Sequence, residues 1–332
     1  AYLETFLRMV KASGLDVRIV FAPYQSFGNR PWASVHPRIE ALVKEIAWPG
    51  AVKVGGRYWS LSPRIWTRFA VRLAKEAYRR LGGKLTIPSY LGRQISDGEA
   101  RIVARVCDEQ PAAITLAEYS SMGPALKKIS SRTIHACLMH DLLSDRAARF
   151  RAGGQLIDFD ETSLETELGW LSSCDLIFFA SVNELETLRP HLPAARIAWV
   201  APDAPEYGAI DESPVPRVVF IGTVHGGNTE ALNHFLAEVW PGIRSEAPSL
   251  EMHIAGSIGK TLTPQQAALP GVKLLGRVDR LESLGGANAI GIAPTRFATG
   301  VSIKVAEYLL LGMPCAAYPL ALEGFGPVLD DL

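Results

Sequence analysis

Short apolar runs alternate with stretches of helical periodicity along the whole chain. The apolar runs cover residues 17–23, 113–118, 134–140, 175–181 and 196–202 in the first half, and 217–223, 251–256, 272–276, 289–294 and 314–319 in the second. A run that is continuously apolar, rather than alternating, is typical of a strand covered on both faces. Strands that are separated by helices predict parallel sheets with right-handed crossover connections.

One segment interrupts this alternation and divides the chain into two parts. Residues 202–216 are rich in proline and acidic residues and have no helical period, which is typical of a linker. The sequence therefore predicts two doubly wound, Rossmann-like α/β domains, 1–205 and 206–332, that face a central cleft. In such sheets ligands bind beyond the carboxyl ends of the strands, so the cleft is the expected site and the linker the expected hinge.

The two ends of the sequence do not coincide with the expected domain ends. Residues 1–12 have the pattern of an amphipathic helix that is followed by the strand at 17–23. A βα unit opens with a strand, so we expect the first strand of the N-terminal domain to be absent from this sequence. We likewise expect the C-terminal domain to be truncated at its end.

The composition of the chain argues against several functional classes. Lysine plus arginine and aspartate plus glutamate each number 34, and this zero net charge argues against a dedicated nucleic-acid binder. The four cysteines form no C-x-x-C pair, which favours free thiols in a reducing, cytoplasmic compartment. No apolar run reaches the ~18 residues that a membrane-spanning helix requires.

The most informative segment is 293–314. A predicted strand ends there, a short loop carries Gly300, and a helix begins at about Ser302. The first turn of a helix offers unpaired N–H groups and the positive end of its dipole, which together suit a diphosphate. Glu307 lies more than a turn inside the helix, where a carboxylate can accept hydrogen bonds from ribose hydroxyls. An ordinary loop glycine and a solvated glutamate are the alternative interpretation of these two residues.

This segment resembles the donor site of family 4 glycosyltransferases, the retaining "group 1" enzymes of the GT-B fold. Their pattern R-F-G-x-G-x-x-x-K-x-x-E, followed by A-x-G-x-P, stands here as Arg296-Phe297-Ala298-Thr299-Gly300 with Lys304 and Glu307, then Leu311-Gly312-Met313-Pro314. The stretches 218–244, 250–256 and 271–294 agree with the family in order and spacing. The resemblance is specific over 217–325, weaker over 130–205 and only topological before that.

The resemblance implies the transfer of a hexosyl group from a nucleoside-diphosphate sugar to a hydroxyl acceptor, with retained configuration. It implies neither a metal nor a cofactor. It implies donor-binding roles for Thr223, His225, Arg277, Val278, Arg296, Thr299, Gly300, Val301, Ser302 and Glu307. It further implies catalytic roles for His140, Lys304 and Glu307.

Two departures from the family pattern concern the diphosphate. Thr299 stands where many members have a first glutamate, and Thr223 stands where many have an arginine, with no lysine nearby. We therefore expect Arg296, Lys304 and backbone amides to neutralise the diphosphate. Lys304 is three residues before Glu307, so a plain i,i+3 salt bridge is the alternative.

The acceptor side is expected at strand ends of the N-terminal domain. His140 and Asp141 end the strand at 134–140, and the resemblance implies that His140 lies close to the transferred sugar. Glu118 also ends a strand, so we predict an acceptor site of Glu118, His140 and Asp141. For Glu118, His140 and His225 the alternative is an ordinary structural role. The expected acceptor is a glycan, a lipid-linked sugar or a small molecule, as in polysaccharide biosynthesis.

Basic residues gather in one predicted helix. Residues 52–84 hold nine lysines and arginines and one acid. At 100° per residue one narrow arc holds Arg64, Arg68, Arg72, Lys75 and Arg79, and the neighbouring face holds Ile65, Trp66, Phe69, Leu73 and Ala77. A basic amphipathic helix suits anionic headgroups, here at the inner face of the plasma membrane, or an anionic acceptor. The alternative is a surface helix whose apolar face packs on the N-terminal domain.

Two other functions fit the same fold. A nucleotide-sugar-binding module without activity would suit the missing basic pair and the missing first glutamate. A sugar-nucleotide 2-epimerase shares the architecture.

Overall fold

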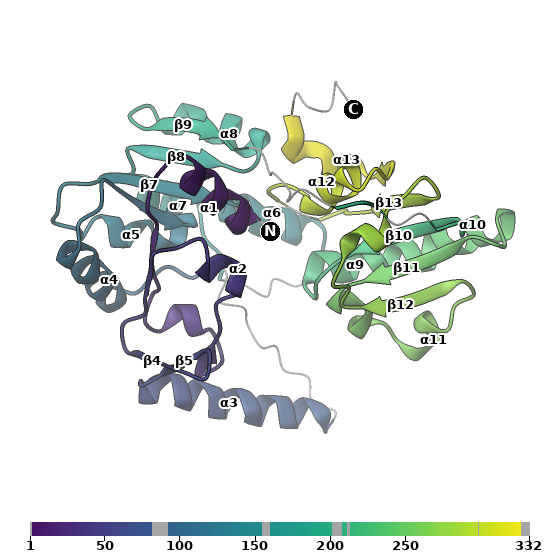
Figure 1. Cartoon of the computed structure of the whole chain (residues 1–332), viewed down its shortest axis with the longest axis horizontal. Coiled ribbons are helices and arrows are strands. Elements are labelled where there is room, and N and C mark those ends of the chain that lie inside the picture. Colours follow the sequence, from purple (N-terminus) through teal and green to yellow (C-terminus); the bar gives the residue numbers. More distant parts are fainter. Residues whose placement is uncertain are drawn as a thin grey trace.

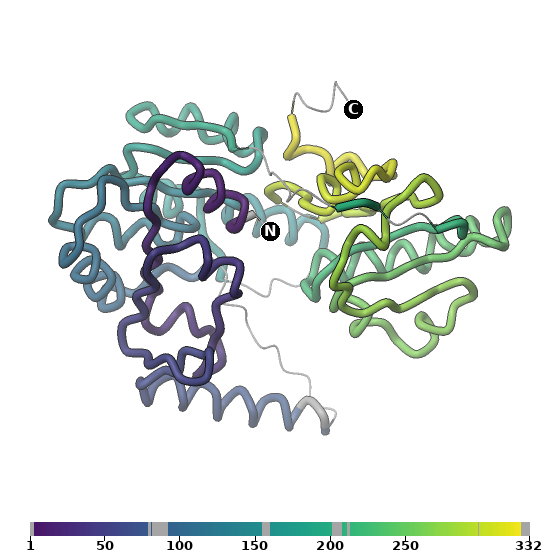
Figure 2. The backbone as a smooth tube through the Cα atoms, in the orientation of Figure 1, coloured from purple at the N-terminus to yellow at the C-terminus, as the bar shows by residue number. Residues whose placement is uncertain are grey.

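The structure is a computed structural model that describes residues 2–81, 92–154, 160–200, 208–210, 213–297 and 299–326. All ten strands predicted from the apolar runs are present, and they form two parallel sheets plus one short parallel pair. The two sheets lie in two separate α/β units, side by side in Figures 1 and 2. Within the linker predicted at 202–216, residues 202–207, 211 and 212 lie outside the described residues, so the exact domain boundary stays a prediction.

The N-terminal domain is built on a four-stranded parallel sheet in the order β6-β7-β8-β9. Its strands are β6 (Ile114–Glu118), β7 (Ile134–Met139), β8 (Leu176–Phe179) and β9 (Arg196–Trp199). The last four residues of β7 are all buried, as expected for a strand covered on both faces. The helices of this domain are α1 (Tyr2–Ala12), α2 (Pro37–Glu40), α3 (Pro63–Arg80), α4 (Asp97–Glu109), α5 (Gly123–Leu126), α6 (Leu143–Ala152), α7 (Leu164–Leu171) and α8 (Val182–Leu188).

Four further strands were not predicted from the sequence. β3 (Glu45–Ala47) pairs in parallel with β1 (Arg18–Val20). β2 (Trp32–Ala33), β5 (Arg57–Ser60) and β4 (Ala51–Val54) form a small antiparallel sheet. These strands have two to four residues each, so none presents an apolar run long enough to stand out from a loop. Their aromatic residues pack against α3, which projects from the lower edge of the domain in Figure 1.

The C-terminal domain has one five-stranded parallel sheet in the order β12-β11-β10-β13-β14. The strands are β10 (Arg217–Ile221), β11 (Glu251–Ala255), β12 (Val272–Gly276), β13 (Ala289–Ala293) and β14 (Cys315–Ala317). The helices are α9 (Gly226–His234), α10 (Trp240–Glu246), α11 (Pro264–Ala267), α12 (Ile303–Leu310) and α13 (Pro319–Leu322). A π-helical turn at Phe235–Val239 joins α9 to α10.

The two domains meet where the carboxyl ends of their parallel strands approach each other. Leu138 of β7 packs in one apolar cluster with Val301 and Ile303, which stand at the start of α12. Helices α6 and α12 lie at this junction in Figure 1. The junction is therefore the place at which residues of both sheets can act on one ligand. In the described part of the chain, no helix combines the length and the apolar character needed to cross a bilayer.

Tyr308 fixes the position of α12 on the sheet. Its side chain is fully buried, and its hydroxyl donates to the Ile292 carbonyl (3.1 Å) and accepts from the Ile221 amide (2.9 Å). The ring lies against Gly291, where a Cβ atom would clash with it. One phenol thus ties α12 to β10 and β13.

We expect Tyr308→Phe to lower the free energy of unfolding by about 1–3 kcal/mol, because the half-buried Ile221 amide loses its acceptor and the Ile292 carbonyl its donor. Denaturant titration measures this change. Tyr78→Phe in α3, whose side chain is 54% exposed, is the matched control and should leave stability unchanged. Equal stability of the two variants would contradict the role of Tyr308.

Candidate active site

The start of α12 presents unpaired donors. Ser302 precedes the helix, and its side chain makes no capping hydrogen bond. Within the described part of the chain, the amides of Ser302, Ile303 and Lys304 have no acceptor. Three free N–H groups at the positive end of a helix dipole form a site that favours an anion such as phosphate.

The loop before α12 is held against the N-terminal domain. The Gly300 amide donates to Glu184 Oε1 (2.7 Å), and the Thr299 hydroxyl donates to Asp141 Oδ1 (3.0 Å). Gly300 has φ +72°, and a Cβ atom there would clash with the His140 carbonyl. The sequence predicts that Gly300 lets the backbone approach a ligand closely. In the structure, the absence of a side chain at Gly300 lets this loop pack closely against the turn after β7.

Glu184 was not predicted from the sequence. Its side chain lies in the first turn of α8 and is 5% exposed, and its Oε2 has no hydrogen-bond partner in the described residues. The pattern Ser181-x-x-Glu184 resembles a plain capping box, and Ser181 does accept from the Glu184 amide. A capping role explains Glu184 in the sequence, so the sequence gives no sign of its contact with Gly300, which is 116 positions away.

Burial raises the pKa of Glu184 to about 8, and the nearby charge of Asp141 acts in the same direction. The nearby Leu142 amide and the hydrogen bond from the Gly300 amide lower this pKa, and the charge of Asp145 raises it further. A carboxyl that titrates near neutrality between two domains is typical of functional sites.

More contacts connect the loop of the C-terminal domain to α6. Phe297 packs on Phe150 and Ala147. Arg149 of α6 bonds Glu323 of the C-terminal domain (2.8 Å). These apolar and ionic contacts place the loop before α12 firmly at the junction.

Lys304 lies between the starts of two helices. Its Nζ donates to Asn228 Oδ1 (2.6 Å) in the first turn of α9 and stands 4.6 Å above the Phe220 ring. Burial lowers the pKa of Lys304 to about 8, although the charge of Glu307 acts to raise it. No ion pair between Lys304 and Glu307 forms within the described residues, so the i,i+3 salt bridge is not what fixes Lys304.

Glu307 is largely enclosed. Burial raises the pKa of its carboxyl, while the nearby Lys304 lowers it. In the part of the chain that the structure describes, no side chain or amide donates to this carboxylate. Its hydrogen-bonding capacity is therefore available to a ligand.

Asn228 is a second residue that the sequence analysis missed. Its amide nitrogen donates to the Thr223 carbonyl (3.0 Å), and its backbone N–H donates to His225 Nδ1 (3.4 Å). Thr223 and His225 are both exposed at this turn. Thr223, His225, Asn228 and Lys304 thus share one corner of the site.

Three residues predicted to bind the donor, Arg277, Val278 and Arg296, make no direct contact with the residues at the start of α12 in the described structure. The guanidinium of Arg296 binds Glu230, with Nε 3.0 Å from Oε1, so its charge is already paired. Val278 packs on the apolar cluster under α12. Arg277 is exposed just beyond β12. The prediction that Arg296 helps to neutralise a diphosphate stays a prediction, and in this structure the guanidinium pairs with Glu230 at the surface.

The predicted acceptor residues lie together at the ends of β6 and β7. His140 Nε2 is 3.3 Å from Glu118 Oε1, and the Tyr119 ring lies 4.7 Å from the imidazole. Tyr119 has φ +72°, the only positive φ of a non-glycine residue in the described ranges. Such backbone strain persists where the surrounding structure enforces it, often at functional sites. Asp141 accepts from Arg146 (3.1 Å) and from Thr299, so it contacts both domains.

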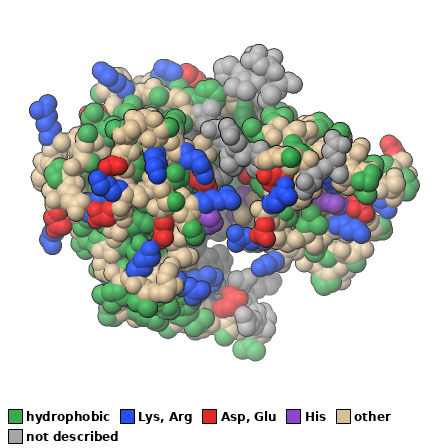
Figure 3. All heavy atoms as spheres, in the orientation of Figure 1, with side chains coloured by type: hydrophobic (Ala, Val, Ile, Leu, Met, Phe, Trp, Pro, Cys, Tyr) green, Lys and Arg blue, Asp and Glu red, His purple; other side chains and the backbone are tan. Residues whose placement is uncertain are grey.

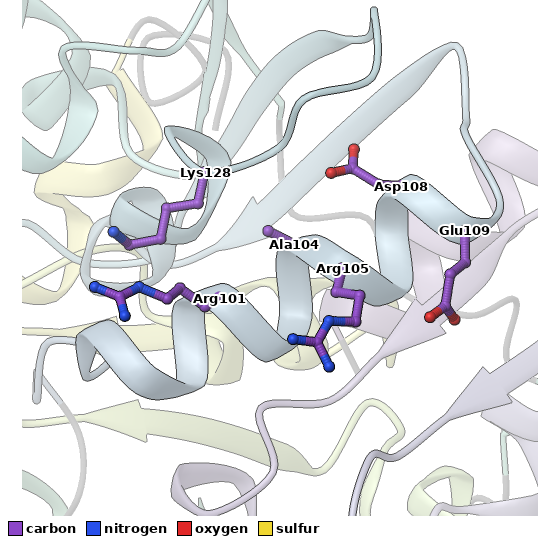
Figure 4. A pocket seen from close by; sticks show the side chains of 6 residues that line it. All are labelled: Arg101, Ala104, Arg105, Asp108, Glu109 and Lys128. Carbon is purple, nitrogen blue, oxygen red and sulfur yellow. The ribbon is translucent and has the colours of Figure 1, made fainter.

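A separate surface hollow of about 560 Å³ lies along α4, lined by Arg101, Ala104, Arg105, Asp108, Glu109 and Lys128 (Figure 4). Helix α4 lies on the side of the N-terminal domain that faces away from the C-terminal domain (Figure 1). Two of the hollow's cations, Arg101 and Lys128, already bind Asp97. We assign this hollow no part in the site. Among the described residues, no three histidine, cysteine or carboxylate side chains gather to hold a metal ion.

Residues 215–329 match the family model described as glycosyl transferases group 1. The C-terminal domain is therefore similar to a group 1 glycosyltransferase domain. A search of curated protein sequences found no match.

Solved structures show the same fold over more of the chain. The sucrose-phosphate synthase of Thermosynechococcus elongatus is 13% identical, with a TM-score of 0.60 over 98% of this chain and 76% of that one. The trehalose-6-phosphate synthase OtsA is 12% identical, with a TM-score of 0.52 over 91% of this chain and 84% of that one. TarM is 10% identical, with a TM-score of 0.52, and the match covers 67% of this chain and 44% of TarM. The chain has the GT-B fold, two Rossmann-like domains, as predicted.

The titration of Glu184 predicts a pH dependence of stability. In the unfolded chain this carboxyl ionises near its ordinary pKa of 4.5, but in the folded chain it ionises at about 8. The folded state therefore binds the extra proton between these values, and this group's contribution to stability falls as pH rises from about 4.5 to 8. In Glu184→Gln this contribution should disappear, because the amide stays neutral and can still accept from Gly300.

Thermal unfolding of both proteins across this pH range tests the prediction. Asp141 and Asp145 face the same carboxyl, so Asp145→Asn is the companion variant and should only shift the midpoint of the pH dependence. An unchanged slope in Glu184→Gln would show that another group carries the dependence.

Proposed function

We propose that this protein transfers a sugar from a nucleoside-diphosphate donor to a hydroxyl acceptor, with retained configuration and without a metal. The proposal rests on the groups at the start of α12. The free amides of Ser302, Ile303 and Lys304 lie there, beside the ammonium of Lys304 and the carboxylate of Glu307, to which no described group donates. The match of residues 215–329 to group 1 glycosyltransferases supports it.

In this proposal the donor diphosphate lies on the amides at the start of α12. The Lys304 ammonium, between α12 and α9, supplies the charge that the sequence lacks at Thr223. Asn228 holds that ammonium at 2.6 Å, so it stays near both helix starts. Glu307 accepts hydrogen bonds from donor hydroxyls, one turn further into the helix.

The acceptor approaches from the N-terminal domain, past the ends of β6 and β7. His140, held between Glu118 and Tyr119, lies next to the transferred sugar. The acceptor hydroxyl attacks on the face that the leaving group departs from, and the leaving diphosphate takes its proton. The new glycosidic bond forms as the bond between the sugar and the diphosphate breaks. The protein contributes positioning and stabilises the charge of the leaving diphosphate.

The inactive binding module remains the second candidate, because Arg296 is paired with Glu230 and Thr223 carries no charge. A thermal-shift screen of UDP-, GDP-, ADP- and dTDP-sugars identifies the donor first. Release of nucleoside diphosphate that depends on added acceptor then supports a transferase. A C2-inverted product would indicate an epimerase, and binding without release would indicate the module.

We expect Glu307→Ala to weaken binding of the matching nucleotide by about 1–3 kcal/mol, because donor hydroxyls lose a buried acceptor. Isothermal titration calorimetry measures this change. Glu246→Ala, at the exposed end of α10, is the control. Affinity equal to that of the control would remove Glu307 from the site.

Lys304→Met separates phosphate recognition from base recognition. The variant keeps the length and apolar stem of the side chain, but loses its charge. Affinity for the nucleoside diphosphate should fall by about 1.5–3 kcal/mol, the range for hydrogen bonds to charged groups, while affinity for the free nucleoside stays constant. An equal loss for both ligands would point to a disturbed fold instead.

A further inference from the structure

Helix α3 is oriented differently from the amphipathic helix predicted from its sequence. Its inner side carries Ile65, which is fully buried, and Phe69, whose ring meets Trp32 edge-on at 5.1 Å. Arg68 and Arg72, on the predicted basic arc, are half-buried on this same side. The basic arc therefore turns partly toward the protein, so much of the predicted apolar face turns outward.

The outer side of α3 is apolar and uncharged. At 100° per residue, an arc of about 160° runs from Leu73 to Val71 and holds no lysine, arginine, aspartate or glutamate. Its large side chains are exposed: Trp66 by 44%, Val71 by 51%, Leu73 by 52% and Tyr78 by 54%. Leu81, just after the helix, is 87% exposed.

The neighbouring small sheet extends this surface. Val52 lies opposite Trp59 in the β4–β5 register, and the Trp59 ring stacks on Trp66 with 12° between the planes. Val52 and Leu61 are 42% and 63% exposed. Figure 3 shows hydrophobic side chains gathered along the lower edge of the molecule, where Figure 1 draws β4, β5 and α3.

Trp66 is held in place on this surface. Its indole N–H donates to the Ser60 carbonyl (2.9 Å), so its polar atom is satisfied while the ring stays exposed. An ordered tryptophan with a bonded N–H and a free apolar edge is suited to the boundary between water and hydrocarbon. A contiguous exposed patch of this kind marks an interaction site in a folded protein.

The positive charge beside the apolar patch favours an anionic lipid surface over a second copy of the chain as its partner. Residues 52–78 carry six basic residues against one acid, and Arg57 and Arg64 among them are exposed. Arg64 borders the apolar arc next to Val71 on the helical wheel. A second copy of the chain would bring two such basic borders together, which like-charge repulsion opposes. Anionic headgroups above a hydrocarbon layer match both the border and the apolar arc.

We propose that the outer face of α3, with Val52 and Leu61 of the small sheet region, docks on an anionic lipid bilayer. The apolar arc enters the interface, and the basic residues beside it meet the headgroups. This inference stands on the surface alone and does not depend on the transferase proposal.

Co-sedimentation of the full chain with vesicles tests the proposal. We expect binding to vesicles of equal parts phosphatidylcholine and phosphatidylglycerol, a blue shift of the tryptophan emission, and little binding to phosphatidylcholine alone. Leu73→Ser with Val71→Ser should weaken binding about tenfold per side chain removed from the interface. The control, Leu274→Ser with Ile114→Ser, removes two apolar residues elsewhere that are exposed to a similar degree, and it should bind normally.

Three outcomes would overturn the proposal. The first is equal vesicle binding by the two double variants, and the second is no binding to the mixed vesicles by the unaltered chain. The third is a dimer, seen by light scattering at the same protein concentration, that the Leu73 and Val71 substitutions abolish, because a second copy would then cover the patch. Circular dichroism of both double variants confirms that each is folded.

Discussion

The contact between the Gly300 amide and the Glu184 carboxylate is the constraint on which the rest of the site depends. It brings the loop before α12, in one domain, to the first turn of α8 in the other. The same loop contacts Asp141 through Thr299, so the turn that carries His140 is fixed at the same time. Without this junction the start of α12 and the ends of β6 and β7 would be two unrelated parts of the chain.

Two buried groups of opposite type titrate near the same pH on the two sides of this junction. Burial raises the pKa of Glu184 and lowers that of Lys304, each to about 8. The cause is the same in both cases, since removal from water disfavours the charged form of either group. A diphosphate bound near Lys304 would favour its charged form, and so would strengthen the interaction that binds the ligand.

The architecture could be predicted from the sequence because its signal is local. Continuous apolar runs predicted every strand of the parallel pairings except β3, and the loop at Gly300 predicted the start of α12. What could not be predicted depends on contacts between distant segments. The bond between Glu184 and Gly300 and the pairing of Arg296 with Glu230 both join segments that lie far apart in the sequence. The helical wheel predicted the two faces of α3 but not which of them points outward. The strands that pack on α3 are too short to be predicted from the sequence.

The attachment of α12 through Tyr308 links the candidate site to the hydrophobic core. Lys304 and Glu307 are carried by the same short helix, whose height above the sheet is fixed by the phenol ring resting on Gly291. Any side chain at that glycine would push the helix outward and carry both charged groups with it. If the proposed site binds the donor, a mutational scan for ligand affinity would thus mark Gly291 as sensitive, although this residue lies in the middle of a strand beneath the helix.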